Sequence, residues 1–231
     1  MHVSPHPDDE AIGAPATLLL LRRAGWEVVN AVVSLGRPAD HDRRRDEAID
    51  AARRAGFVLV VPHEPFAISS GDDLACVEPL VTAWLARVVA DEEPALVVSP
   101  SPHDAHPGHE VVARATRSVI ERMSDPVPWL TWSLWADLPS PNVYVPFGDD
   151  VLAEARHVLA AYRGELARND YGRLLEARSI ANAVLGRERI FGFGSPRRST
   201  APYAEMLADQ RFTGGAWIPG PTRAFDPADP T

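Results

Sequence analysis

Short, nearly continuous runs of β-branched and other apolar residues alternate with longer amphipathic blocks over residues 1–125. Such runs indicate buried strands, whereas apolar positions spaced three and four apart indicate helices. The predicted strands are residues 1–5, 26–35, 57–61 and 95–99, and the predicted helices are residues 9–25, 42–55, 74–90 and 108–123. Alternation of strands with helices is typical of βαβ units. The pattern therefore predicts an α/β fold, a Rossmann-like three-layer αβα sandwich with a mostly parallel sheet.

The pattern loosens beyond Pro126. One or two edge strands around a proline-rich bend are favoured there by Trp129, Trp132, Trp135, Val143 and Val145. Two further helices are predicted at residues 149–166 and 170–185. Glycine and proline become frequent from residue 194 onward, which is typical of a mobile terminus. We therefore predict a single domain over residues 1–194, in which residues 126–194 shape the substrate pocket, and a Pro/Gly-rich tail over residues 195–231.

Composition narrows the possible functions. The chain has 231 residues, of which 45% are hydrophobic, so it can bury a proper core. Its formal net charge of −9 argues against a nucleic-acid-binding surface, which would need clustered basic residues. We find neither a signal-peptide pattern nor a run of about twenty apolar residues, which predicts a cytoplasmic protein without a membrane span. Composition does not determine the oligomeric state, and a homo-oligomer remains open.

Histidines and carboxylates follow two of the predicted strands. Residues 6–10 (His-Pro-Asp-Asp-Glu) follow the first strand, residues 103–110 (His-Asp-Ala-His-Pro-Gly-His-Glu) follow the fourth, and each cluster opens a helix. Taken singly, each cluster resembles an ordinary helix N-terminus, where Asp and Pro are favoured. Because the carboxyl ends of parallel strands meet at one edge of a sheet, the two clusters are expected to lie together, which favours a functional site.

A metal site in this chain would have to use histidine and carboxylate, since Cys76 is the single cysteine. His6 and Asp9, spaced i, i+3, together with one histidine of the second cluster would offer Zn²⁺ three ligands and leave a fourth position for water. Zinc lowers the pKa of such a water to about 7, and Asp8 is free to accept its proton. The residues therefore predict a hydrolytic zinc site, with the histidine of the second cluster left open.

Both clusters carry a recognisable motif. Residues 6–10, followed by Ile12 and Gly13, and residues 106–110 (His-Pro-Gly-His-Glu) resemble the two motifs of the LmbE-like (PIG-L) zinc N-deacetylases, which read H-P-D-D-E and H-P-D-H. Residues 44–48 (Arg-x-x-Glu-Ala) are similar to the R-x-x-E-A helix of that family. The resemblance covers residues 1–125 well and the C-terminal third loosely. It implies an LmbE-like fold and a zinc-dependent N-deacetylase.

The resemblance also implies roles for individual residues. His6, Asp9 and His109 would be the zinc ligands, and Asp8 would be the general base that activates the water. His106 would stabilise the oxyanion, and either His106 or Asp8 would protonate the leaving amine. The family's substrates imply hydrolysis of an acetamide on a GlcNAc-type amino-sugar of a small metabolite, glycolipid or antibiotic intermediate, with release of acetate and the free amine.

The second motif departs from the family pattern at Gly108, where the family has Asp. That Asp is expected to orient the neighbouring histidine, so another carboxylate would have to support His106. Asp104 and Glu110 are the candidates, and we favour Asp104 because it lies two residues before His106 on the same loop.

Other residues carry weaker signals. Arg44 is a candidate substrate contact, although an i, i+3 pair with Glu47 is the simpler interpretation. The three tryptophans at 129, 132 and 135 would suit a sugar-stacking wall, but large aromatics belong more often to the core. Strand alternation would place the second of them on the face opposite the other two. No role is predicted for Tyr162 or Glu165, and the remaining candidates are expected at the surface (His2, His41, His63 and His157) or in the interior (Cys76).

Two alternatives remain open. The same zinc site would also suit cleavage of a larger amide, as in the mycothiol-conjugate amidases of the family. A non-hydrolytic Rossmann-type nucleotide-binding protein would need a Gly-rich phosphate loop after the first strand, and the acidic residues 8–10 stand there instead.

Overall fold

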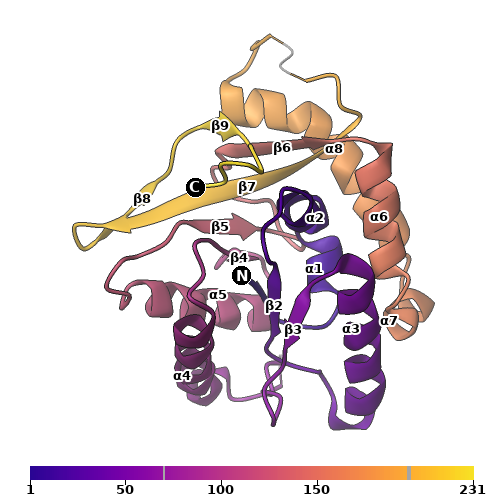
Figure 1. The fold of residues 1–231 in the computed structure, drawn as a ribbon, viewed down its shortest axis with the longest axis vertical. Coiled ribbons are helices and arrows are strands. Elements are labelled where there is room, and N and C mark those ends of the chain that lie inside the picture. The colour runs from indigo at the N-terminus through magenta and orange to yellow at the C-terminus, as the bar shows by residue number, and fades with distance from the viewer. Residues whose placement is uncertain (70, 197–198) are drawn as a thin grey trace.

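The structure is a computed structural model that describes residues 1–69, 71–196 and 199–231 (Figure 1). Its strands are β1 (His2–Ser4), β2 (Val29–Val32), β3 (Val58–Val60), β4 (Val97–Pro100), β5 (Trp129–Trp132), β6 (Val143–Phe147), β7 (Tyr203–Thr213), β8 (Ala216–Pro219) and β9 (Arg223–Ala224). Its helices are α1 (Asp9–Ile12), α2 (Pro15–Arg23), the 3-10 helix η1 (Pro38–Asp40), α3 (His41–Ala55), α4 (Leu74–Glu92), α5 (Pro107–Ile120), α6 (Asp149–Leu159), α7 (Arg163–Arg168) and α8 (Tyr171–Phe191). Within the described ranges, no helix is long and apolar enough to cross a membrane.

The strands of the described residues form one nine-stranded sheet with the order β3-β2-β1-β4-β5-β7-β6-β9, and β8 pairs with β7 outside this path. The first five strands pair in parallel, whereas β7 runs antiparallel to both β5 and β6. The chain order reverses between β1 and β4, which are neighbours in the sheet. In an open α/β sheet, such a reversal creates a crevice at the carboxyl ends of the strands. The two predicted site clusters follow these two strands.

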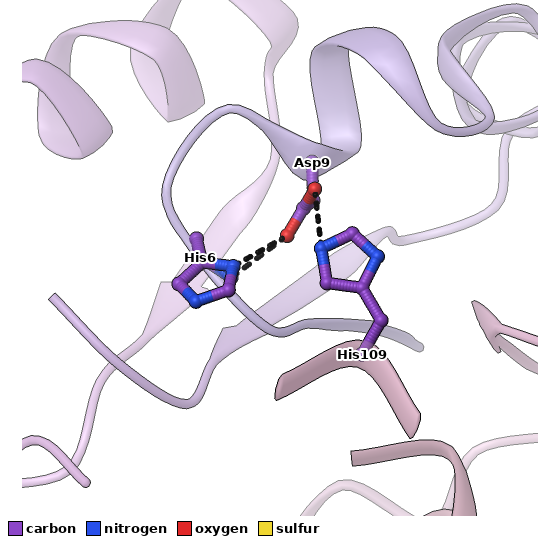
Figure 2. A group of neighbouring side chains, drawn as sticks. All are labelled: His6, Asp9 and His109. Carbon is purple, nitrogen blue, oxygen red and sulfur yellow. Dashed lines mark hydrogen bonds and ion pairs between the residues drawn. The ribbon is translucent and has the colours of Figure 1, made fainter. Parts of the chain in front are cut away.

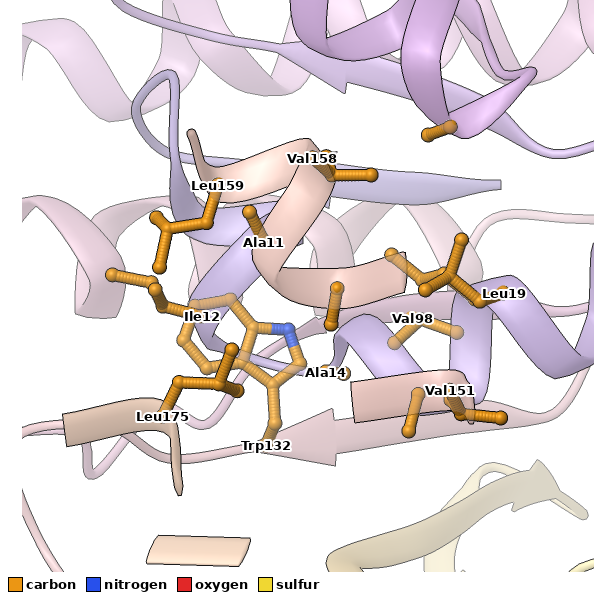
Figure 3. Packing of buried hydrophobic residues seen from close by; sticks show 14 of the residues in the cluster. Ala11, Ile12, Ala14, Leu19, Val98, Trp132, Val151, Val158, Leu159 and Leu175 are labelled. Atoms are coloured by element: carbon orange, nitrogen blue, oxygen red, sulfur yellow. The ribbon is translucent and has the colours of Figure 1, made fainter. Parts of the chain in front are cut away.

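Helices cover both faces of the sheet. One core cluster joins α4 and α5 to one face, and another joins α1, α2, α3 and α6 to the other (Figure 1). Adjacent residues of β4 point to opposite faces, since Val97 belongs to the first cluster and Val98 to the second. Figure 3 shows Trp132 of β5 in the second cluster, with Ile12 of α1 and Leu175 of α8 beside it. The predicted α/β sandwich with a mostly parallel sheet is confirmed.

The predicted tail over residues 195–231 is wrong for β7, because this strand lies inside the sheet. Residues 203–207 of β7 pair with β6, and residues 208–210 pair with β5. The buried carboxylate of Glu205 in β7 accepts hydrogen bonds from the backbone N–H groups of Ala16 and Thr17, at 2.6 and 2.9 Å. These donors at the start of α2 would otherwise lack partners. The strand β7 is therefore part of the core.

Several local predictions also need correction. The helix predicted over residues 9–25 is two helices, because Pro15 starts α2 and the preceding Ala14 is not helical (φ −145°, ψ 45°). The strand predicted as buried at residues 57–61 is the edge strand β3, in which Val58 is exposed. His2 is fully buried and hydrogen-bonded to Asn30, whereas Cys76 is exposed. The environments predicted for His2 and Cys76 are thus reversed.

Candidate metal centre

Three side chains converge at the carboxyl edge of β1 and β4: His6, Asp9 and His109 (Figure 2). Nδ1 of His6 lies 3.4 Å from Oδ2 of Asp9, and Nε2 of His109 lies 3.4 Å from Oδ1 of the same carboxylate. One donor atom from each residue lies within 4.8 Å of the others. Two ligands that bind a tetrahedral zinc at about 2.0–2.1 Å lie about 3.4 Å apart. The spacing of the donors therefore fits zinc or a similar divalent metal.

The electrostatics of His6 and Asp9 favour metal binding, whereas His109 would release a proton when it binds a metal. Burial lowers the pKa of His6, which keeps its imidazole neutral. Burial alone would raise the pKa of Asp9, but His109 and His6 outweigh it and hold the pKa of this carboxyl below its usual range. Burial likewise opposes the charged form of His109, but Asp9 and Asp104 raise its pKa. A carboxylate that stays ionised between two imidazoles is the deprotonated donor that a metal requires.

Asp104 supports His109 rather than His106, which corrects the prediction made from the sequence. Its Oδ2 accepts a hydrogen bond from Nδ1 of His109 at 2.6 Å. Ala105 adopts a left-handed conformation (φ 59°), and this turn separates Asp104 from the nearby His106. A carboxylate bonded to Nδ1 fixes the tautomer of a histidine and leaves Nε2 free to coordinate a metal. The other candidate, Glu110, pairs with Arg114 at 4.0 Å.

Gly108 has no room for a side chain. A Cβ atom at this position would lie 2.6 Å from the carbonyl oxygen of Ile68 and 3.3 Å from Cε1 of His6. An Asp here would therefore displace either the backbone at residue 68 or one of the three candidate ligands. The departure from the family motif follows from the packing of the residue 68 segment against the start of α5.

A cleft of about 730 Å³ opens beside the three donors. The sequence-predicted residues Asp8, His106 and Arg44 all line it, together with Trp135 and Glu165. Its walls come from loops after β1, β2, β4 and β5 and from α3 and α7. The structure therefore brings every predicted site residue to one cleft except Asp104, which lies fully buried behind His109.

Asp8 adopts a left-handed backbone conformation, with φ 106° and ψ −22°. Such a conformation is uncommon outside glycine, and strained backbone of this kind clusters at functional sites. Burial and the neighbouring Asp9 raise the pKa of Asp8 well above its ordinary value, although Arg44 opposes them from 4.0 Å. Nη2 of Arg44 also donates to the carbonyl of Pro7 at 3.2 Å, which holds the turn in place. The pKa of the Asp8 carboxyl is thus shifted in the direction that favours uptake of a proton.

His106 is half-buried in the cleft wall. Burial and the neighbouring His109 and His6 lower the pKa of His106 to about 4, so its imidazole is neutral at pH 7. Its Nδ1 has no hydrogen-bond partner among the described residues. A neutral imidazole can donate one hydrogen bond to a substrate oxygen and so polarise a carbonyl group.

The predicted pair between Arg44 and Glu47 is absent from the described ion pairs. Glu47 accepts instead from Arg43 at 2.7 Å, at the i, i+4 spacing, and Arg44 lies 3.5 Å from Glu165. Glu165 also accepts from Arg168 at 2.8 Å. The sequence offered no signal for Glu165, because it reaches the site from α7 and not from either motif.

Two aromatic residues also have roles that the sequence did not indicate. Trp135 is 45% exposed and lines the cleft, whereas Trp129 and Trp132 are buried. Because Trp135 lies beyond the end of β5, strand alternation does not apply to it. The buried Tyr162 donates a short hydrogen bond to Oε1 of the equally buried Glu10.

Comparison with known proteins identifies a family and a shared fold. A family model described as PIG-L, GlcNAc-PI de-N-acetylase, matches residues 1–120. No curated protein matches the chain. Among solved structures, the A40926 pseudoaglycone deacetylase Dbv21 is 17% identical with a TM-score of 0.70, over 96% of this chain and 97% of that one.

Two further solved structures share the fold. The N,N'-diacetylchitobiose deacetylase from Pyrococcus horikoshii is 15% identical with a TM-score of 0.67, over 90% of this chain and 82% of that one. GalB, the 4-carboxy-2-hydroxymuconate hydratase from Pseudomonas putida KT2440, is 20% identical with a TM-score of 0.64, over 90% and 94%. At these identities the likeness shows the fold alone, and the fold occurs both in deacetylases and in a hydratase.

The family match rests on the part of the chain that carries the candidate donors. Residues 1–120 are more than half of the 231 residues and include His6, Asp9 and His109. They also include the helix that presents Arg44 to the cleft. The chain belongs to the PIG-L family.

Proposed function

We propose that the protein is a zinc-dependent N-deacetylase that hydrolyses the acetamide of a GlcNAc-type amino-sugar and releases acetate and the free amine. The observation that carries this proposal is the convergence of the His6, Asp9 and His109 donors with Asp8 and His106 in one cleft. Two imidazole nitrogens and one carboxylate oxygen are a donor set typical of catalytic zinc. Membership of a family described as GlcNAc-PI de-N-acetylases supports the reaction type.

When bound to these donors, zinc would polarise the amide carbonyl and lower the pKa of a coordinated water to about 7. Asp8 would accept a proton from the attacking water as the water oxygen bonds to the acetyl carbon. His106 would donate a hydrogen bond to the former carbonyl oxygen as negative charge develops there. Asp8 would then give its proton to the sugar nitrogen as the C–N bond breaks, which leaves acetate and the amine.

The pKa values support Asp8 rather than His106 as the group that protonates the amine. The pKa of Asp8 is raised well above its ordinary value, so this carboxyl can hold the proton between the two steps. The pKa of His106 is lowered to about 4, so its imidazole is neutral at pH 7. A neutral imidazole can donate a hydrogen bond through its single N–H but has no acidic proton to give to the amine.

The cleft walls support a sugar as the part of the substrate next to the acetamide. The exposed ring of Trp135 has its centroid 6.4 Å from that of His106 and 6.4 Å from that of Tyr171. Its face offers a flat apolar surface of the kind that packs against the C–H groups of a pyranose ring. The Arg44–Glu165 pair on another wall offers both donors and acceptors for hydroxyl groups. A site with one aromatic wall and one polar wall suits an amphipathic ring such as GlcNAc.

The proposal is tested by metal analysis and by acetate release from three GlcNAc conjugates, linked to a nucleotide, to inositol and to a glycopeptide aglycone. We expect about one zinc per chain and loss of turnover after chelation. Asp8→Asn should keep the metal and lower kcat by about 10²- to 10⁴-fold, whereas His109→Ala should lose the metal. Asp50→Asn, which alters a surface carboxylate paired with Arg53 and Arg54, should change neither. Turnover that survives chelation would overturn the proposal.

A mycothiol-conjugate-type amidase would use the same residues on a larger acyl group. Measuring the acid released from conjugates with acetyl and bulkier acyl groups separates the two reactions, and we expect acetate to be the preferred product. The nucleotide-binding alternative loses support, because the buried Asp8, Asp9 and Glu10 at the end of β1 would repel a phosphate.

A further inference from the structure

Asp104 is a carboxylate with 0% exposure, and no arginine of the described residues forms an ion pair with it. A buried carboxylate is costly unless hydrogen bonds or a positive charge compensate for lost water. Oδ2 accepts from His109, as described above, and Oδ1 accepts from three donors on the loop after β5. These donors are the hydroxyl of Ser133 at 2.5 Å and the backbone N–H groups of Leu134 at 2.5 Å and Trp135 at 2.9 Å.

Arg178 of α8 binds the opposite ends of the same two peptide groups. Its Nη1 donates to the carbonyl of Leu134 at 2.8 Å, and its Nη2 donates to the carbonyl of Ser133 at 3.0 Å. The Ser133 carbonyl and the Leu134 N–H belong to one peptide group, and the Leu134 carbonyl and the Trp135 N–H belong to the next. Each peptide group therefore has a guanidinium at its carbonyl end and the Asp104 carboxylate at its amide end.

This arrangement lets the charge of Arg178 stabilise the charge of Asp104 without direct contact. A peptide group has a dipole of about 3.5 D, and hydrogen bonds in series polarise one another in a low-dielectric interior. The positive charge on Arg178 strengthens both N–H donors, so it stabilises Asp104 without touching it. Its two-pronged contact also fixes the positions of the donors, because a guanidinium is a rigid fork.

We propose that Arg178 is a positioning residue for the candidate metal ligand His109. It would act through the two peptide groups and Asp104, which hold Nδ1 of His109 as a donor and keep Nε2 facing Asp9. The proposal rests on the metal site of the proposed function but not on the substrate or the reaction. Arg178 lies in α8, outside the residues 1–120 that the family model matches.

The chain offers a matched control for Arg178. Arg189, on the same helix, also donates to a backbone carbonyl, that of Leu138 at 2.5 Å. No hydrogen bond among the described residues joins the peptide groups of Leu138 to Asp104, so Arg189→Gln removes a similar contact but not the connection to His109. The variants to compare are Arg178→Gln, Arg178→Lys, Asp104→Asn, Arg189→Gln and the double variant of Arg178→Gln with Asp104→Asn.

The measurement is the zinc dissociation constant of the full-length apoprotein, obtained by competition with a chromophoric chelator. Loss of a residue that orients a metal ligand typically weakens metal binding by about 10- to 100-fold. We expect a loss of this size for Asp104→Asn and about tenfold for Arg178→Gln. Arg178→Lys should lose less, because it keeps the charge but cannot span two carbonyls. Arg189→Gln should stay within about twofold of wild type, since scattered contacts of this kind add little.

The double variant gives the decisive result. If Arg178 acts through Asp104, then Arg178→Gln should weaken zinc binding no further once Asp104 is Asn, because coupled residues are not additive. Wild-type affinity in both Arg178 variants, additive losses in the double variant, or an equal loss in Arg189→Gln would each overturn the proposal. A wild-type chain that bound no divalent metal would overturn it together with the proposed function, whereas failure of deacetylation alone would leave the zinc measurements to decide.

Discussion

Restoring the family residue at position 108 should damage this protein rather than improve it. The Cβ atom of Gly108→Ala would lie 2.6 Å from the backbone oxygen of Ile68, and an Asp would add further atoms in the same place. Since a backbone atom cannot rotate away, we expect the segment at residue 68 or the start of α5 to shift. Inserting extra atoms into packed interiors costs about 1–3 kcal/mol. The second contact, 3.3 Å to Cε1 of His6, passes part of that shift to a candidate metal ligand.

Gly172 provides the control, because a Cβ there would meet only Oδ1 of Asp170 at 3.8 Å. This residue lies in the first turn of α8, so Gly172→Ala should be neutral or stabilise the fold by up to about 1 kcal/mol. The two Gly→Ala variants should therefore differ by about 1–4 kcal/mol in the free energy of unfolding. Urea denaturation of the apoproteins measures this difference, and chelator competition measures zinc affinity. A Gly108→Ala or Gly108→Asp protein as stable as Gly172→Ala, with unchanged zinc affinity, would refute the steric argument.

Three further perturbations test separate parts of the structure. Trp135→Ala should raise KM about tenfold, the equivalent of about 1.4 kcal/mol of lost ring contact, with no change in zinc affinity. An unchanged KM would show that Trp135 does not contact the substrate. Tyr162→Phe leaves the buried Glu10 without its donor and should cost about 1–3 kcal/mol in urea denaturation, whereas Tyr203→Phe, with its partner at the surface, should cost much less. Burial raises the pKa of Glu205 from 4.5 to about 7, so the folded chain keeps a proton there that the unfolded chain has lost. That stabilisation is complete below pH 4.5 and disappears as the pH rises to about 7. Glu205→Gln should therefore reduce the fall in unfolding free energy across this window by up to about 3 kcal/mol. An unchanged dependence of the unfolding free energy on pH would contradict the raised pKa of Glu205.

Local patterns predicted the parallel half of the fold well, because each βα unit there carries its own hydrophobic period and its own turn signals. The strand β7 escaped prediction for a physical reason. It carries two buried carboxylates, Glu205 and Asp209, and charged residues normally indicate solvent exposure. Glu205 binds the start of α2, and Asp209 pairs with Arg223 at 3.3 Å as well as with the nearby Arg211, so the distant partners become visible only in three dimensions.

The candidate donors could be predicted because they lie in two short motifs at adjacent strand ends, and the structure places them together. Their support could not be predicted from spacing. Proximity in sequence favoured a hydrogen bond between Asp104 and His106. Ala105 between them adopts a left-handed conformation, and Asp104 accepts a hydrogen bond from His109 instead. The i, i+3 pattern similarly favoured Arg44 with Glu47, although Arg43 at i, i+4 is the residue that reaches it.

The site therefore depends on two kinds of information in the chain. The identity of the candidate metal ligands is local information, because their motifs can be recognised from neighbouring residues in the sequence. Donor orientation is not, because Asp104 is held by the loop after β5 and that loop is held by α8. A buried carboxylate with four hydrogen bonds has few alternative positions. A substitution that moves α8 relative to β5 should therefore either move His109 or break a hydrogen bond between Arg178 and His109 along this path. Metal affinity should for this reason respond to residues far outside the two motifs, and most strongly to those that contact the two peptide groups between Arg178 and Asp104.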